Sequence, residues 1–400
     1  MAPKREAALV FGLRLVRRLD WALLAAVLAL SVYGLVMVYS ATRAAEAPGL
    51  PPPSQFAQKQ VIWLVLGLAA FALVLVWDYR AIARWHIPVY ALAMVLLVAV
   101  LRIGQSPTGA ASWIAVGAFR LQPSELAKIA VILSLAAFVS RRADAVGSLR
   151  LVLKSLLLAG APVVLVVLQP DFGTALVTVG IWFGVLYLAG ARGRQLAGVL
   201  ACGLLLFALM WNLDRLPLER IRPAPLGRVL VHARLKDYQK RRLTIFLRPQ
   251  ADPLGAGYHV LQSRLAIGSG EVFGRGLFRG TQSRLRFIPE RHTDFIFAVV
   301  GEELGLVGAS AMLLLYLFLF WRGLRVALRA RDTLGSLVAA GAVSMLMFHT
   351  IVSIGMSVNI MPITGIPLPF VSYGGSNMLA SFIALGLLQN VHTRCFTTSF

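Results

Sequence analysis

The sequence predicts an all-α polytopic membrane protein with about ten transmembrane helices, and three observations lead to this fold class. Hydrophobic residues make up 58% of the 400 residues and charged residues only 14%, and the mean hydropathy is +0.76. A soluble domain typically carries about 25% charged residues. The apolar residues gather in runs close to the roughly 20 residues that a membrane-spanning helix needs. Because these runs show no alternation, a β-barrel is excluded, and residues 1–400 are expected to form a single integral membrane domain.

The apolar runs mark ten spans in chain order. The first run follows Arg14, Arg17 and Arg18 and is longer than the core of a signal peptide, so we expect it to be retained as a helix. The predicted spans are residues 20–41, 60–77, 86–101, 124–140, 152–168, 173–190, 195–212, 295–320, 335–356 and 370–391.

The distribution of Lys and Arg predicts the orientation, because short loops rich in these residues stay in the cytoplasm. One side collects Lys4, Arg5, Arg14, Arg17, Arg18, Arg80, Arg84, Arg141, Arg142, Arg150, Arg192, Arg194, Arg322, Arg325, Arg329, Arg331 and Arg394. The opposite short loops hold only Arg43, Lys59, Arg102 and Arg120. Both termini are therefore predicted to be cytoplasmic.

A long hydrophilic stretch, residues 213–293, is predicted to be an extracytoplasmic loop between spans seven and eight. It is rich in Lys and Arg, which agrees with this placement because long loops translocate largely regardless of charge. Its amphipathic runs at 238–247 and 260–267 favour interfacial helices. The alternative is a disordered basic loop that lies on anionic lipid.

The formal net charge of +22 indicates an anionic partner. No separate basic domain is present to bind nucleic acid, so the membrane and phosphorylated lipids are the expected partners. Two cysteines, Cys202 and Cys395, are too few for a disulfide framework. Neither a phosphate-binding loop for nucleotides nor a metal-ligand motif occurs, so we expect no nucleotide cofactor and assign no metal-ligating residues.

Two similar motifs place carboxylates at predicted outward helix starts. Gln122-Pro-Ser-Glu-Leu-Ala-Lys128 puts Glu125 and Lys128 three residues apart, on one helix face. Gln169-Pro-Asp-Phe-Gly-Thr174 places Asp171 in the same way. Ionisable groups in spans are functional candidates by default, so these three residues are predicted to line one polar, substrate-binding cavity. Helix caps and a neutralising ion pair explain them equally well.

The strongest constellation runs from Arg284 to Glu303. Asp294 stands at the predicted outer mouth of the eighth span, before an apolar run. A carboxylate there suits a general base, and nearby cations suit an anionic leaving group. The cationic candidates are Arg284, Arg286, Arg291 and His292. The structural alternative is a helix cap made by Thr293 or Asp294, and Glu302 and Glu303 are expected to neutralise a buried arginine.

Taken together, six motifs resemble the SEDS family (shape, elongation, division and sporulation), and their details resemble its elongation-type members more than its division-type members. The motifs occur in family order over nearly all the chain, at residues 122–128, 169–174, 252–270, 280–282, 289–297 and 366–376. The sequence departs from the family pattern at Ser112, Glu271, Ser353 and Asn359, and Ser112 stands where an arginine is common.

The resemblance implies a peptidoglycan glycosyltransferase that polymerises lipid II at the outer face of the bacterial inner membrane. It implies that Asp294 is the essential carboxylate and that Glu125 and Lys128 are required. Gln282 and Trp113 join the expected substrate-binding residues. The implied partners are lipid II, glycan linked to undecaprenyl diphosphate and a class B penicillin-binding protein, and a divalent cation (Mg²⁺ or Mn²⁺) is considered as an aid to leaving-group departure.

Two alternatives stay open on the sequence. One is a transporter that flips lipid II, and the other is a non-catalytic scaffold for the penicillin-binding protein. Without the resemblance, the residues favour an enzyme and a transporter about equally.

Overall fold

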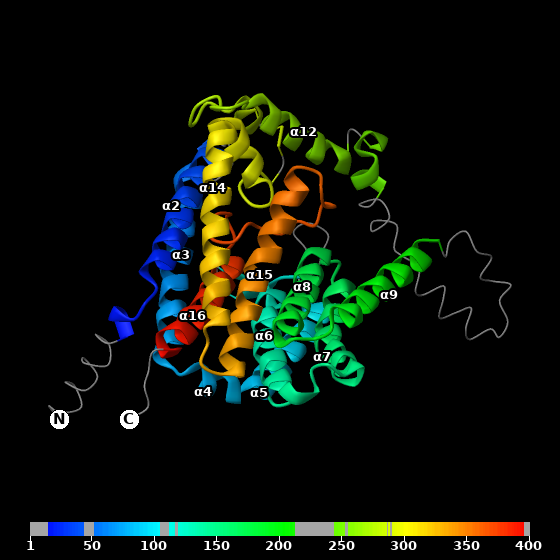
Figure 1. The fold of residues 1–400 in the computed structure, drawn as a ribbon. Helices are drawn as coiled ribbons and strands as arrows, with labels where there is room; N and C mark the ends of the chain where they lie inside the picture. The colour runs from blue at the N-terminus through cyan, green and yellow to red at the C-terminus, as the bar shows by residue number, and fades with distance from the viewer. Residues whose placement is uncertain are drawn as a thin grey trace.

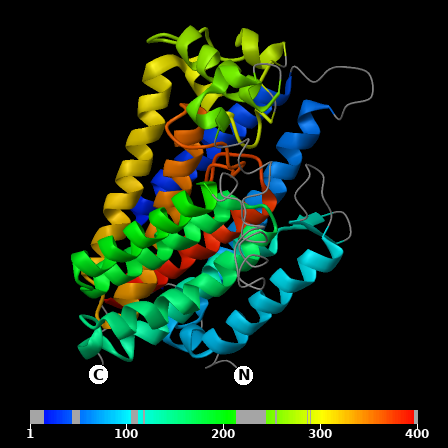
Figure 2. The same cartoon turned by 90° about the vertical axis from the view of Figure 1, so that its right-hand side faces the viewer.

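All ten predicted spans are helices. The computed structural model describes residues 15–43, 52–104, 112–116, 119–212, 244–252, 255–285, 287–288 and 290–395. The ten helices are α2 (Trp21–Arg43), α3 (Pro53–Val76), α5 (His86–Ile103), α6 (Pro123–Ser140), α7 (Leu149–Leu168), α8 (Phe172–Ala189), α9 (Gly193–Asn212), α14 (Ile296–Leu328), α15 (Thr333–Ser357) and α16 (Gly375–Cys395). They form a helical bundle (Figures 1 and 2).

Eight of these helices are long and apolar enough to cross a membrane by length and composition, in the part of the chain that the structure describes. The other two are α9, whose apolar part is shorter, and α16. Most of α16 is buried against α3 and α15. A helix enclosed by protein has no need of a continuous apolar surface, so polar residues such as Gln389 and Asn390 are tolerated in it.

The connections are short elements. They comprise the helix α4 (Tyr79–Arg84), the antiparallel strands β1 (Ile114–Val116) and β2 (Phe119–Leu121), the 3₁₀ turns η1 (Ala143–Ala145) and η4 (Pro249–Ala251), and the helices α12 (Ala256–Ser269) and α13 (Thr281–Arg284). Helix α12 forms where an interfacial helix was predicted and lies across one end of the bundle (Figure 1). Most of the predicted amphipathic run at 238–247 lies outside the described residues. We call the α12 end the outer end, after the predicted orientation.

Helix α14 extends to Leu328, eight residues beyond the predicted span. Its backbone leaves helical geometry at Gly305, which has a φ of 63°. The first turns, which follow Asp294, therefore form a separate short piece that bends away from the long piece. Glycine allows this break because it lacks the Cβ that makes positive φ costly.

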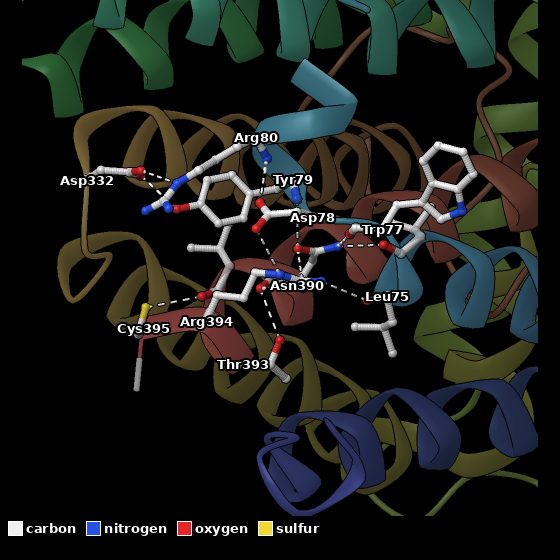
Figure 3. Close-up of polar contacts among 12 residues, drawn as sticks. Leu75, Trp77, Asp78, Tyr79, Arg80, Asp332, Asn390, Thr393, Arg394 and Cys395 are labelled. Carbon is white, nitrogen blue, oxygen red and sulfur yellow. Dashed lines mark hydrogen bonds and ion pairs between the residues drawn. The ribbon is translucent and has the colours of Figure 1, made fainter. Parts of the chain in front are cut away.

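Asn390 joins the inner ends of three elements (Figure 3). Its side-chain Oδ1 accepts a hydrogen bond from the backbone N–H of Tyr79 (3.1 Å), and its Nδ2 donates to the carbonyls of Val74 and Trp77 (both 2.5 Å). Arg394 also donates to Asn390 Oδ1 (2.6 Å). The exposed carbonyls at the end of α3 are thus satisfied by a side chain of α16.

Two aspartates extend this inner network. Asp332 caps α15 through the N–H of Gly335 and accepts hydrogen bonds from Tyr79 and Arg80, each at 2.8 Å. Asp20, at the start of α2, pairs with Arg322 near the end of α14 (2.6 Å). Burial alone raises the pKa of Asp20, but the hydrogen bonds from Arg322 and Leu23 outweigh it and hold this pKa below its usual value. Loops that were predicted to share one side of the membrane therefore meet at one end.

We expect Asn390→Ala to lower the free energy of unfolding by about 1–3 kcal/mol, because it leaves buried carbonyls and an N–H without partners. The matched control is Asn212→Ala, which removes one exposed hydrogen bond to Ala208. The measurement is thermal unfolding of the purified protein in detergent. Equal melting temperatures for the two variants would contradict the role given to Asn390.

Candidate functional site

The outer half of the bundle is organised around a non-helical segment, residues 358–374, which connects α15 to α16. We call it the buried segment because its central part lies inside the protein: Thr364, Ile366, Leu368, Phe370, Val371 and Ser372 are buried, whereas Ile360 is exposed. Irregular backbone at membrane depth requires internal hydrogen-bond partners. Tyr316 of α14 donates to the carbonyl of Pro369 (2.5 Å), and Gln60 of α3 donates to the carbonyl of Ser372 (3.1 Å).

The buried segment holds the stretch that carries Asp294. The Ser372 hydroxyl donates to the carbonyl of Thr293 (2.5 Å), and the N–H of Tyr373 donates to the carbonyl of His292 (3.0 Å). Asp294 itself lies beside Gly365: a Cβ added at Gly365 would be 3.2 Å from the carboxylate Oδ2. Gly365 has a φ of +72°, so a side chain there would be strained and would crowd the carboxylate.

The hydroxyl of Thr293 does not form the predicted helix cap. The Thr293 Oγ1 donates to the carbonyl of Glu290 (3.1 Å), and the N-cap position of α14 is occupied by Phe295, which provides no side-chain cap. Asp294 is partly exposed and stands two residues before the first residue of α14. Its N–H donates to the carbonyl of Glu290 (3.0 Å). A compact turn at 290–294 thus fixes the backbone of Asp294.

Arg291 and His292 attach this turn to the first two spans. The Nε of Arg291 donates to the carbonyl of Ala41 in α2 (2.6 Å). The His292 ring contacts the rings of Phe56 (centroids 5.0 Å apart) and Tyr373 (5.6 Å), and these two rings also contact each other. Burial lowers the pKa of His292, and Arg291 adds to this effect while Glu290 opposes it. His292 is therefore held as a neutral ring in an aromatic setting.

Asp171 forms the predicted helix cap and also reaches the start of α6. It caps α8, where Oδ1 accepts from the N–H of Thr174 (3.1 Å). Its Oδ2 accepts from Gln122 Nε2 (2.9 Å) and from the hydroxyl of Ser124 (3.3 Å), both at the start of α6. The two Gln-Pro motifs, which are 47 residues apart in sequence, are thereby joined in space.

The buried segment also reaches this pair of helix starts. The Ser376 hydroxyl, at the start of α16, accepts from the N–H of Gln122 (2.9 Å). At Gly173 of α8, an added Cβ would approach Ile366 to 2.3 Å and Thr364 to 3.0 Å. Residues 364–366 therefore contact the start of α8 through Gly173 and the Asp294 carboxylate through Gly365.

Lys128 and Glu125 form the predicted ion pair, and the structure adds a third member. Lys128 Nζ lies 2.8 Å from Glu125 Oε1 and 2.8 Å from Nε2 of His349 on α15, and His349 Nε2 is 3.7 Å from Glu125 Oε1. All three side chains are at most 1% exposed. Because an ammonium group only donates, His349 Nε2 accepts and Nδ1 carries the proton.

His349 was not predicted as a site residue. It stands inside an apolar span, and the free-energy cost of placing an ionisable side chain there was a signal that could have identified it. Four polar atoms in this region have no hydrogen-bond partner among the described residues: Glu125 Oε2, His349 Nδ1, Ser353 Oγ and Thr174 Oγ1. Helices α6, α8 and α15 pack against one another here. Since buried polar groups are normally satisfied, these atoms mark space for bound water or for polar substrate groups.

The remaining predicted binding residues lie elsewhere. Arg284 is exposed at the end of α13, Trp113 is half-buried beside Ser112, and Arg286 lies outside the described residues. Ser112, where an arginine was expected, donates to the carbonyl of Gln169 (3.1 Å). Gln282 donates its backbone N–H to Glu302 (2.6 Å). The structure does not connect Arg284 with the contacts around Asp294.

Glu302 and Glu303 anchor the outer loop to α14. Glu302 accepts from the N–H groups of Gln282 and Ser283 at the start of α13, at 2.6 and 3.0 Å. Glu303 accepts from the hydroxyl of Ser40 (2.7 Å) and the N–H of Phe278 (3.1 Å). An arginine partner was expected, but the described residues supply hydroxyl and backbone donors instead.

No group of three or more His, Cys, Asp and Glu side chains that could hold a metal ion occurs in the ranges that the structure covers. The divalent cation considered on the sequence stays a prediction, because ions such as Mg²⁺ are often held by one or two carboxylates together with substrate phosphates.

A family model for cell cycle proteins of the FtsW, RodA and SpoVE type matches residues 20–395. The chain belongs to the FtsW/RodA/SpoVE family. MrdB of Escherichia coli strain K12, named a peptidoglycan glycosyltransferase, is 38% identical over 375 residues, which cover 94% of each protein. These relatives and the apolar helices together show that this FtsW/RodA/SpoVE member is a multi-pass membrane protein of the elongation type.

Solved structures of the family agree. A chain of a peptidoglycan synthase complex, described as coordinating polymerization and crosslinking, has a TM-score of 0.73 and 31% identity and covers 95% of this chain and 99% of its own. The rod-shape-determining protein RodA of Thermus thermophilus has a TM-score of 0.64 and 28% identity, with 95% and 98% covered. The predicted resemblance and the all-α membrane fold are confirmed.

We expect Lys128→Met to lower the free energy of unfolding by about 3–5 kcal/mol, because it leaves the carboxylate of Glu125 buried without a cation. The double variant Lys128→Met, Glu125→Leu removes both charges and should recover much of this loss. Thermal unfolding of the single and double variants measures the difference. If Glu125→Leu lowers the free energy of unfolding as much in the Lys128→Met protein as in the unaltered protein, the two side chains are not coupled.

The lowered pKa of His292 predicts a pH-dependent stability. The unfolded chain binds the proton more readily than the folded protein. The contribution of neutral His292 to the free energy of unfolding is therefore fully present above the ordinary pKa of about 6.5. It is lost as the pH falls from that value through the lowered pKa. The variant His292→Asn should therefore show a smaller drop in melting temperature between pH 7.5 and pH 5 than the unaltered protein. Parallel curves would contradict a buried, neutral His292.

Proposed function

We propose that this protein is a peptidoglycan glycosyltransferase that polymerises lipid II during cell elongation. The observation that carries the proposal is the fixed position of the Asp294 carboxylate, beside Gly365 and at the end of a hydrogen-bonded turn. The names of relatives such as MrdB support the activity. The joining of the helix starts of α6 and α8 through Asp171 supports a polar site at the outer face of the bacterial inner membrane.

In the proposed reaction Asp294 is the general base. It takes the proton of the 4-hydroxyl of the lipid II N-acetylglucosamine as that oxygen attacks C1 of the N-acetylmuramic acid at the end of the growing chain. The new C–O bond forms as the bond from C1 to the diphosphate oxygen breaks, and undecaprenyl diphosphate leaves with the electron pair. A direct displacement inverts C1 and needs no covalent enzyme intermediate.

Charge on the leaving diphosphate needs cations. Arg284, exposed on α13, and Arg286, outside the described residues, are the proposed sources from the outer loop. Arg291 is proposed to act with them, although its Nε is engaged with Ala41. No step is assigned to a metal. The cation prediction is tested by comparing polymerisation with and without a chelator.

We propose a class B penicillin-binding protein as the partner that crosslinks the new strands. The similar synthase complex, described as coordinating polymerization and crosslinking, supports this pairing. The proposed placement has both termini in the cytoplasm. It is supported by the hydrogen bonds that join the start of α2 and the end of α16 through Asp20 and Gln389, at 3.0 and 2.9 Å.

A transporter that flips lipid II is the first alternative, and a scaffold without activity is the second. Transport requires a polar route through the bundle, whereas the polar groups around Lys128 lie about one turn below the outer start of α6. Below them, α6 buries an apolar run that includes Ile129, Val131, Ile132 and Leu133. This arrangement favours a site open to one leaflet.

We expect Asp294→Asn to abolish polymerisation of labelled lipid II by the purified protein with its partner, because the amide cannot accept the proton. The control is Glu290→Gln, an exposed change four residues away. Glycan products are separated by gel, and melting curves verify folding. Unchanged polymer from Asp294→Asn would remove the base assignment.

Flipping of lipid II without polymer would favour the transporter, and normal cell-wall synthesis by Asp294→Ala would favour the scaffold.

A further inference from the structure

The inner ends of helices α6 to α9 carry a group of exposed cations, which we call the basic patch. Figure 1 shows α7, α8 and α9 together on the side of the bundle opposite α2 and α3. The patch is built from two connections, one between α6 and α7 and one between α8 and α9. Its exposed members are Arg141, Arg142, Arg150, Lys154, Arg192 and Arg194. The only carboxylate in residues 141–154 and 189–200 is that of Asp144.

The two connections form one surface. Gln195, in the first turn of α9, donates from Nε2 to the carbonyl of Gly147 (2.9 Å), two residues before α7. A Cβ added at Gly147 would lie 3.6 Å from Nε of Arg192, so the Arg192 side chain lies against the α6–α7 connection. Arg192 therefore adds its charge to those of that connection.

The cations of the basic patch are not neutralised by the protein. Among the residues that the structure describes, no carboxylate forms a salt bridge with any of them. Other arginines of the inner end are paired: Arg80 with Asp332, Arg322 with Asp20, and Arg394 with Asp78. The orientation of the helices requires only that cations be present in the short loops. Cations that are gathered and left unpaired repel one another, which favours the binding of an anion.

One exposed face of α7 leads from the basic patch into the apolar part of the helix. Arg150, Leu153, Lys154 and Leu157 are three or four residues apart and therefore share this face. Both cations are exposed, and Leu153 and Leu157 are 47% and 74% exposed. Tyr187, near the inner end of α8, is also exposed, and tyrosine is enriched where helices meet lipid headgroups. Cations followed by exposed apolar surface match a phospholipid, whereas a nucleic acid or a soluble acidic protein has no counterpart for the apolar part.

We propose that the basic patch binds an anionic phospholipid with two phosphates, of the cardiolipin type, with its headgroup at Arg150 and Arg192 and its acyl chains along α7. Two phosphates match cations that come from two connections. Guanidinium groups bind phosphate oxygens through charge-assisted, often bidentate, hydrogen bonds. Basic pockets between membrane helices bind headgroups of this class. The patch lies at the inner end of the bundle and Asp294 at the outer end, so this binding does not depend on the proposed reaction.

The test is native mass spectrometry of the purified full-length protein, released from detergent that contains cardiolipin. We expect the unaltered protein to retain cardiolipin, and to retain less phosphatidylglycerol at the same phosphate concentration. The double variant Arg150→Gln, Arg192→Gln should bind cardiolipin about tenfold more weakly, which corresponds to 1.4 kcal/mol. Each single variant should show a smaller loss. Both side chains are exposed, so the fold should be kept, which melting curves verify.

The matched control is the double variant Arg17→Gln, Arg329→Gln, which removes two exposed cations near the inner ends of α2 and α14. It should bind cardiolipin like the unaltered protein. Equal losses in the two double variants would overturn the proposal, because retention would then reflect net charge alone, and so would unchanged binding by the Arg150 and Arg192 variant. Equal retention of the two lipids per phosphate would also overturn it. Displacement of cardiolipin by a soluble poly-glutamate peptide would instead indicate an acidic protein partner and reject the lipid.

Discussion

The outer half of this protein depends on one constraint: a buried, non-helical backbone must find all of its hydrogen-bond partners inside the protein. The buried segment 358–374 meets part of this requirement by bonding to the Asp294 turn, α3 and α14, and Ser376 directly after it bonds to the start of α6. Satisfying the segment therefore fixes the relative positions of the parts of the site. Gly34 of α2 and Gly375 of α16 permit this, because a Cβ at either would clash with Val371 or Trp63.

The inner end is closed by side chains that serve as partners for exposed helix termini. Asn390 satisfies the end of α3, Gln389 satisfies the start of α2, and Asp332 joins α4 to α15. These polar residues make α16 less apolar than a lipid-facing helix. The same feature explains its absence from the spans recognised by composition. The inner end is fixed, and α14 breaks at Gly305. The loops can therefore determine the shape of the outer end.

The sequence predicted the fold well because apolar runs of span length are a local signal, and all ten runs became helices. Local spacing also predicted the Glu125–Lys128 pair and the cap by Asp171. It did not predict His349, which joins Lys128 across 221 residues, or the buried position of the central part of segment 358–374. Both depend on contacts between helices that are distant in sequence. The extension of α14 to Leu328 was missed because a helix can continue into a basic loop.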